Sequence, residues 1–162
     1  MRIPFEQVVT RHGATVLRVC RAALGAGPDA DDAWSETFLS AFIAWPDLAE
    51  DTNVQAWLVR VAQRKTIDIV RKRARQPVPT DAVPETMHED TRADEDVWQS
   101  VASLPERQRL AVAYHYFGGL SHVETAELIG GTPEAVRRAA ADGIRSLRMR
   151  LATPEHPKGA LR

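Results

Sequence analysis

Apolar residues recur at three- and four-residue spacing along most of this chain of 162 residues, and no alternating strand pattern competes with them. Such spacing gathers apolar side chains on one face of an α-helix, where they can be buried against other helices. Glycines and prolines separate the apolar segments. The pattern predicts helices over residues 5–24, 29–45, 54–75, 94–102, 105–116, 121–129 and 133–151. The sequence therefore predicts an all-α fold.

Capping residues support several of the predicted helix starts. Asn53 precedes the third helix, and its side chain can accept a hydrogen bond from the first turn. Ser121 and Glu124 have the spacing of a capping box, in which each side chain bonds to the backbone N–H of the other residue. Thr132 followed by Pro133 is a typical helix start, because proline suits the first helical position. These signals indicate where the helices begin.

A segment poor in apolar residues divides the chain. Residues 76–93 carry prolines and acidic residues with little surface to bury, so their composition predicts a flexible acidic linker. This leaves a first domain over 1–75, a second domain over 94–152 and a tail over 153–162. We expect two small helical domains, each near the lower size at which a hydrophobic core sustains itself.

The formal net charge of −1 conceals a strong segregation of charge along the chain. Residues 28–51 carry −7 and residues 76–100 carry −6, whereas residues 58–75 carry +6 and residues 134–151 carry +3. Two basic blocks separated by an acidic one indicate an anionic partner that is contacted at two places, with nucleic acid the first candidate. A solvated helix face is the simpler alternative for either block alone.

Several classes of protein do not fit the sequence. Cys20 is the single cysteine, so neither an intrachain disulfide nor a multi-cysteine zinc site can form, as expected in a reducing compartment. The N-terminal residues lack the apolar core of a signal peptide, and no run reaches the ~18 apolar residues of a membrane span. The five histidines show no metal-ligand spacing, and no phosphate-binding glycine loop occurs. We therefore expect no membrane insertion, no metal, no cofactor and no catalytic residues, which makes an enzyme the least favoured class.

The clearest functional pattern is a pair of short helices joined by two glycines. Ala126 lies where the helices would cross, Gly130 can adopt the backbone conformation of a tight turn, and Val136 can seal the corner. This arrangement is typical of a helix-turn-helix, whose second helix enters a major groove of DNA. An αα-hairpin without a DNA role shows the same pattern, but the five arginines of the second helix favour phosphate contacts.

Two helices of the first domain have unusual surfaces. The third helix combines basic residues with Trp57, which suits single-stranded or melting DNA, although Trp57 also fits a core position. The polar loop before that helix, residues 47–53, can form a pocket for an extruded base. The acidic second helix fits a docking face for a protein, with Phe38 and Phe42 as anchors.

Three segments together resemble a known family. The sequences DADDAWSETFLSAF (29–42), NVQAWLVRVAQRKTIDIVRKR (53–73) and LPERQRLAVAYHYFGGLSHVETAELIG (104–130) are similar to the extracytoplasmic-function sigma factors, the two-domain branch of the sigma-70 family. The resemblance covers residues 4–75 and 95–151. It implies a sigma region 2 helical bundle and a sigma region 4 helix-turn-helix. It also implies that the chain performs no bond chemistry and directs core RNA polymerase to specific promoters.

The resemblance implies a role for each segment. The acidic helix falls in the part that docks on the β′ clamp helices of the polymerase: Asp31, Asp32, Glu36, Thr37, Phe38 and Phe42. The third helix and its N-cap fall in the part that captures and melts the −10 promoter element: Asn53, Trp57, Arg60, Arg64, Lys65, Asp68, Arg71 and Lys72. The helix-turn-helix falls in the part that reads the −35 element: Ser121, Thr132, Glu134, Arg137, Arg138 and Arg145.

Partners and location are implied by the same resemblance. The implied partners are promoter DNA and core RNA polymerase, which is contacted at its β′ clamp helices and its β flap. Many members of the family are also held inactive by an anti-sigma factor. The implied location is the bacterial cytoplasm, in association with the nucleoid when the chain is part of the holoenzyme.

The sequence departs from the family pattern at two places. Gln63-Arg64 stands where the family often has Arg-Asn, so the contact from that asparagine to the −10 element is missing. Ala139 and Asp142 replace two cations that are usual in the recognition helix, and Gly143 lowers helix propensity by about 1 kcal/mol relative to alanine. We expect altered or weak −35 recognition. The expected substitute contacts are Arg137, Arg138 and Arg145.

Two other functions explain part of the sequence. A tetrahelical helix-turn-helix regulator, which binds an operator without polymerase, accounts for residues 104–151 but leaves the acidic and basic helices of the first domain unused. A sigma-like decoy, which binds an anti-sigma factor and never reads DNA, accounts for Ala139 and Asp142. Co-purification with core polymerase separates the regulator from a sigma factor, and run-off transcription separates the decoy.

Overall fold

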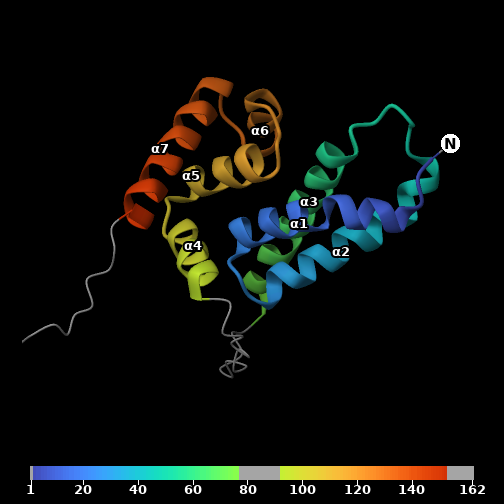
Figure 1. Ribbon diagram of the computed structural model, residues 1–162, viewed down its shortest axis with the longest axis horizontal. Helices are drawn as coiled ribbons and strands as arrows, with labels where there is room; N and C mark the ends of the chain where they lie inside the picture. The colour runs from blue at the N-terminus through green and yellow to red at the C-terminus, as the bar shows by residue number, and fades with distance from the viewer. Residues whose placement is uncertain (1, 77–91, 153–162) are drawn as a thin grey trace, which may run out of the picture.

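The computed structural model describes residues 2–76 and 92–152, and every regular element within those ranges is a helix (Figure 1). The first range holds α1 (Phe5–Leu24), α2 (Pro28–Ala44), the short 3-10 turn η1 (Trp45–Asp47) and α3 (Val54–Arg75). The second holds α4 (Arg92–Ala102), α5 (Glu106–Ala111), the π-helical segment η3 (Val112–Phe117), α6 (His122–Ile129) and α7 (Pro133–Ala152). The predicted all-α fold is confirmed. The predicted tail, and all but the ends of the predicted linker, lie outside the described residues.

Three helix starts have the caps that the sequence predicts. The side chains of Asn53 and Thr132 each accept a hydrogen bond from the backbone N–H three residues further on, both at 3.1 Å. Ser121 and Glu124 form the complete capping box, with N···O distances of 2.9 and 3.0 Å. These bonds satisfy backbone donors that have no partner within the helix, so each one fixes where a helix begins.

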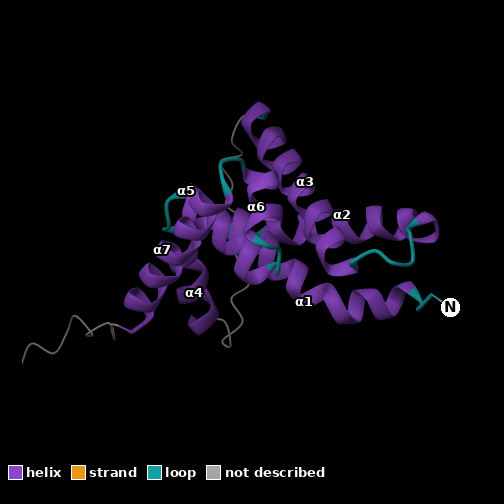
Figure 2. Cartoon of the chain, turned by 90° about the horizontal axis from the view of Figure 1, so that it is seen from above, coloured by secondary structure: helices purple, strands orange, loops and turns teal. Residues whose placement is uncertain are grey.

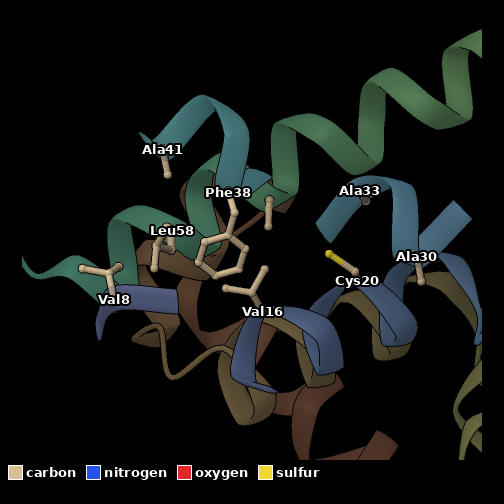
Figure 3. Packing of buried hydrophobic residues seen from close by; sticks show 9 residues of the cluster. Val8, Val16, Cys20, Ala30, Ala33, Phe38, Ala41 and Leu58 are labelled. Carbon is tan, nitrogen blue, oxygen red and sulfur yellow. The ribbon is translucent and has the colours of Figure 1, made fainter. Parts of the chain in front are cut away.

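Helices α1, α2 and α3 form a bundle around one apolar core. α1 and α2 lie side by side, and α3 contacts both (Figure 1 and Figure 2). The ring of Phe38 from α2 lies next to Val16 of α1 and Leu58 of α3, and all three side chains are buried (Figure 3). Cys20 belongs to the same cluster, and burial raises the pKa of its thiol to about 12. The thiol is therefore protonated at neutral pH and behaves as a small apolar core residue.

The second range forms a smaller assembly, and one of its helices changes type part-way along. The helix predicted over 105–116 is α-helical for six residues and then continues as the π-helical η3. At the end of η3 the N–H of Gly118 bonds to Ala113 O at 2.9 Å, five residues back. The prediction of a continuous α-helix is therefore wrong in its second half. The wider turn places Val112 in a cluster with residues of α4 and α7, and Tyr114 in a cluster with α3.

The two predicted domains pack against each other. α1 contacts α4, α5 and η3 of the second domain. Val19 of α1 and Val59 of α3 form one buried cluster with Tyr114 and Leu120. Ala22 of α1 belongs to a second shared cluster, and all five of these residues are at most 2% exposed. The domains therefore share buried apolar surface, which the separate helix patterns do not reveal.

Gly143 lies where α7 approaches the π-helical segment. A Cβ atom at this position would lie 2.8 Å from Val112 Cγ2 and 3.4 Å from Gln108 O. Gly143 is buried, so a larger residue would have to displace the atoms around it. The low helix propensity of glycine is therefore offset by the close packing that glycine permits.

We expect Gly143→Ala to lower the free energy of unfolding by about 1 kcal/mol. An overpacked contact costs ~1–3 kcal/mol, which exceeds the ~1 kcal/mol gained in helix propensity. Chemical denaturation measures the change. In a Val112→Ala background, which removes the opposing methyl groups, the same substitution should become neutral or stabilising. A clear gain in stability in the natural sequence would contradict the close contact.

Candidate nucleic-acid interface

The exposed face of α2 is acidic near its N-terminus and apolar near its C-terminus. At 100° per residue, three exposed acidic residues and three exposed large apolar residues share this face, which we call the α2 outer face. Its members are Asp31, Asp32, Glu36, Leu39, Phe42 and Ile43. Leu39, Phe42 and Ile43 are 62%, 59% and 69% exposed. Apolar side chains clustered at such exposure are typical of surfaces that contact another protein.

Two of the residues predicted to contact the polymerase do not reach the α2 outer face. Thr37 is fully buried, and its hydroxyl donates to the backbone carbonyl one turn back at 2.6 Å. Phe38 is 6% exposed, and its ring centroid lies 4.7 Å from that of Trp34. Both residues therefore belong to the core and can affect a partner only by holding α2 in place. Sequence reasoning missed Leu39 and Ile43, although their helical spacing from the acidic residues was a readable signal.

Basic residues form a stripe along the exposed side of α3. Arg64 and Arg71 are exposed on one face of the helix, with Asp68 between them. Arg60 continues this face toward the N-terminus of α3 and is partly buried. The α3 basic stripe consists of Arg60, Arg64, Asp68 and Arg71, with Lys65 and Lys72 at its edge. The structure thus brings six of the eight residues predicted for the −10 element together on one surface.

The other two residues predicted for the −10 element lie at the start of α3, beside the loop after α2. Asn53 is exposed and caps the helix. Trp57 packs on the core of the first domain, and its ring centroid lies 6.5 Å from that of Trp45. Next to the loop lies a hollow of about 270 Å³, lined by residues of the N-terminal segment, of η1 and of the loop itself. The predicted loop over 47–53 therefore borders an open cavity.

Helices α6 and α7 meet in the geometry expected of a helix-turn-helix. Ala126 and Val136 are buried in the cluster between the two helices. Gly130 and Gly131 have φ values of 86° and 84°, in a region that other residues rarely adopt. Arg107 of α5 donates a hydrogen bond to Gly130 O at 2.7 Å and so ties the turn to the rest of the domain. The contact of Arg107 is tertiary, so no spacing in the sequence indicates it.

Four of the residues predicted for the −35 element lie on the exposed face of α7. This α7 outer face consists of Glu134, Arg137, Arg138 and Arg145. Ala139 lies off that face and packs against the core of the helix-turn-helix. Asp142 Oδ1 lies 3.2 Å from Arg145 Nη1 on the exposed surface. Of the two departures from the family pattern in this helix, only Asp142 therefore changes the charge available on the α7 outer face.

The helix-turn-helix carries further polar groups at its helix starts. Ser121 and Thr132 are exposed at the N-termini of α6 and α7, with their side-chain oxygens engaged as caps. The ring of His122 stacks on that of His115, with 4.0 Å between centroids and 24° between planes. Desolvation, together with the neighbouring His115 and Arg137, lowers the pKa of His122. The neutral form is also favoured by the positive end of the α6 dipole.

Glutamine side chains connect α3 to the second domain. Gln55 Nε2 donates to Gly118 O at 3.2 Å. Gln63 Nε2 lies 3.5 Å from Leu128 O, and Gln63 is 8% exposed. Gln63 departs from the family pattern, and in this structure it serves as a contact between the domains.

Arg60 of the α3 basic stripe faces two acidic residues of α6. Its Nη2 atom lies 3.8 Å from Glu124 Oε1 and 3.7 Å from Glu127 Oε2. These distances are too long for hydrogen bonds, and the side chains are partly exposed, so the pairs contribute little to stability. They nevertheless place negative charge beside Arg60, which opposes the binding of a phosphate at that position while the domains are in contact.

Comparisons with known proteins agree with this geometry. Residues 8–76 match the model of Sigma-70 region 2, and residues 94–147 match that of Sigma-70, region 4. The ECF RNA polymerase sigma factor SigE of Mycolicibacterium smegmatis is 30% identical over 159 residues, which cover 91% of this chain and 62% of SigE. The ECF RNA polymerase sigma factor ShbA of Streptomyces griseus is 30% identical over 152 residues, which cover 82% of this chain and 79% of ShbA. The chain belongs to the extracytoplasmic-function sigma factors.

A solved structure extends the comparison to the fold of this sigma factor. The sigma factor RpoE of Bartonella quintana, in complex with the anti-sigma factor NepR, superposes with a TM-score of 0.69 at 16% sequence identity. The match covers 92% of this chain and 97% of RpoE, so the two proteins share a fold. Within residues 2–76 and 92–152, no helix combines the length and the apolar character that crossing a membrane requires.

We expect Val59→Glu to separate the two domains of this sigma factor without unfolding either one. The new carboxylate would be buried beside Tyr114 and Leu120 while the domains touch, and it would be solvated once they part. Small-angle scattering should show a larger radius of gyration, with helical circular dichroism retained. The neighbouring Leu58→Glu is the control, because Leu58 lies inside the core of the first domain and its replacement should cost helicity. An unchanged radius of gyration for Val59→Glu would contradict the role of Val59 in domain contact.

Proposed function

We propose that this sigma factor directs core RNA polymerase to specific promoters and so takes part in transcription initiation. One observation carries the proposal: sigma regions 2 and 4 occur in one chain, and each exposes a basic helix face, on α3 and on α7. Two separate cationic faces suit two segments of one DNA molecule. The proposal requires only binding, so it assigns this chain no enzymatic activity, metal or cofactor.

The α2 outer face is the proposed docking site for the β′ clamp helices of the polymerase. Its acidic residues supply charge for orientation, while Leu39, Phe42 and Ile43 supply apolar area. Thr37 and Phe38 support the same contact from inside, because they hold α2 against the core. The β flap is the second proposed polymerase contact and involves the second domain.

The α3 basic stripe and the loop before α3 are the proposed site for the −10 element. Arginine and lysine side chains there can bind the phosphates of a melting strand. The hollow of about 270 Å³ beside the loop can take a base that has left the stack. Asn53 fixes the first turn of α3, and Trp57 supports the loop from its half-buried position.

The α7 outer face is the proposed reader of the −35 element. Arg137 and Arg138 are free to contact phosphates or guanine edges, and Glu134 can accept from the amino group of cytosine. The N-termini of α6 and α7 add backbone donors for phosphate. Because Asp142 lies beside Arg145, we infer that −35 recognition differs from that of relatives with a cation in place of Asp142.

Promoter recognition in this proposal requires the domains to separate. The −10 and −35 elements are two separate segments of one promoter, so each domain has to face its own segment of DNA. In the closed arrangement the domains share two buried clusters and two glutamates of α6 lie beside Arg60 of the α3 basic stripe, so the domain contact competes with DNA at that stripe. Polymerase binding would have to favour the separated state by more than the domain contact favours the closed one.

Location and regulation are also part of the proposal. We place the protein in the bacterial cytoplasm, with the nucleoid when it is bound to polymerase. RpoE of Bartonella quintana occurs in a complex with an anti-sigma factor. We infer that an anti-sigma factor is a further partner of this chain.

Run-off transcription tests the proposal directly. The purified chain is mixed with bacterial core polymerase and a promoter library, and the transcripts are sequenced. Transcripts that start at a common promoter sequence would support a sigma factor. Polymerase binding without transcripts would favour the sigma-like decoy, and DNA binding without any affinity for polymerase would favour the stand-alone regulator.

We expect the double variant Leu39→Ala, Ile43→Ala to weaken polymerase binding at least about tenfold. Two exposed apolar anchors are removed, and the loss of one buried anchor commonly costs more than ~1 kcal/mol. Fluorescence anisotropy with labelled chain measures the affinity, and thermal unfolding should be unchanged. Val70→Ala is the matched control, because Val70 is 56% exposed on α3, away from the α2 outer face. Equal effects of the control and the double variant would exclude this face as the docking site.

We expect Arg137→Ala, Arg138→Ala to lower promoter affinity and to flatten its salt dependence. Each lost phosphate contact reduces the slope of log K against log salt by about 0.9. Holoenzyme binding to a selected promoter at several salt concentrations measures the slope. Arg150→Ala serves as the control, because Arg150 is exposed on α7 but points away from the α7 outer face. An unchanged slope would remove Arg137 and Arg138 from the interface.

A further inference from the structure

The segment before α1 contacts the loop after α2. Arg2 donates hydrogen bonds from Nη1 to Trp45 O and from Nη2 to Leu48 O. Its guanidinium carbon also lies 5.2 Å from the centroid of the Trp45 ring, within the range of a cation–π contact. One side chain therefore bonds to the first residue of the short turn η1 and to the residue that follows it, and covers the aromatic ring of Trp45.

The guanidinium group suits this position. Backbone carbonyls near the end of a helix form the negative end of its dipole, and each oxygen has two lone pairs, so Trp45 O can bond to Arg2 as well as to the N–H of Leu48 at 3.3 Å. A planar cation with parallel N–H groups can satisfy two such carbonyls at once, which a lysine ammonium cannot do in the same geometry. Two of the five N–H donors of Arg2 are used in this way, so three remain for a ligand.

Arg2 also lines the hollow that the loop borders. The residues around this cavity of about 270 Å³ include Arg2, Ile3, Trp45, Leu48, Glu50 and Val54. The lining combines apolar walls with one cation and one carboxylate, and apolar walls with a few polar groups are typical of sites that bind small organic groups. Trp45, which Arg2 contacts, also packs against the apolar core of the first domain, so Arg2 ties the loop to a fixed part of that domain.

We propose that Arg2 is a positioning residue for −10 recognition: it holds η1 and the adjoining loop so that the hollow is already formed when a base leaves the stack. This inference rests on the proposed function and adds to it a residue outside the loop and outside α3. A preformed pocket lowers the cost of ordering the loop when DNA binds, so base selection at one position depends on Arg2.

Selection from a DNA library by holoenzyme tests the role of Arg2. Holoenzyme is assembled from bacterial core polymerase and the natural chain, Arg2→Ala, Arg2→Lys or Arg18→Ala. Each binds DNA with a randomised −10 element, and the bound molecules are sequenced. Arg18→Ala is the matched control, because Arg18 is an exposed cation of α1 with the same charge. Amide hydrogen exchange of residues 45–53 is measured in parallel on each free chain.

Arg2→Ala and Arg2→Lys should both flatten the base preference at one position of the −10 element by about tenfold, the usual size of discrimination at one base pair. The other positions and the −35 preference should stay as in the natural chain, the loop amides should exchange faster, and Arg18→Ala should change nothing. An unchanged profile for Arg2→Ala, or an equal loss at every position, would overturn the role of Arg2. A natural chain that selects no sequence at all would instead remove the proposed function, and this inference with it.

Discussion

Helix α1 is apolar on two faces, and the rest of the structure depends on how those faces are covered. One face contributes Val16 and Cys20 to the core of the first domain. The other contributes Val19 and Ala22 to the clusters shared with the second domain. A helix with so wide an apolar surface cannot be covered by α2 and α3 alone, so the second domain supplies the remaining cover.

The closed arrangement is held mainly by apolar contacts. The Arg60 pairs with Glu124 and Glu127 are long and partly exposed, so salt and solvent weaken them. The buried side chains of Val19, Val59 and the other residues of their cluster are the stronger contribution, because burial of apolar surface contributes roughly 25 cal/mol per Å². Tyr114 belongs to this cluster, and its burial raises the pKa of the phenol to about 12, so the interface carries no charge from that side chain.

The local features of the fold could be predicted from the sequence, because their causes are local. The caps at Asn53, Ser121 and Thr132 depend on residues within one turn, and the glycine turn of the helix-turn-helix depends on a positive φ. Features that depend on tertiary contact could not be predicted. The periodicity of α2 does not say which of its aromatic residues faces inward. It therefore predicts both Phe38 and Phe42 as surface anchors, although Phe38 is buried and only Phe42 is exposed. The contacts of Arg2 and Arg107 join segments that are distant in sequence, and no motif reports them.

The π-helical turn η3 has a consequence for how this protein tolerates changes of length. Val112 and Ala113 belong to one buried cluster and Tyr114 to another, so three consecutive residues contribute side chains to two different clusters. A π-helical turn accommodates one residue more than an α-helical turn. Deletion of one residue here would restore regular α-helix and rotate α5 by about 100° relative to the segment on the C-terminal side of η3. Either Val112 and Ala113 would then leave the interior cluster of the second domain, or Tyr114 would leave the cluster that it shares with α3. The number of residues in this stretch is therefore constrained as strongly as their identity.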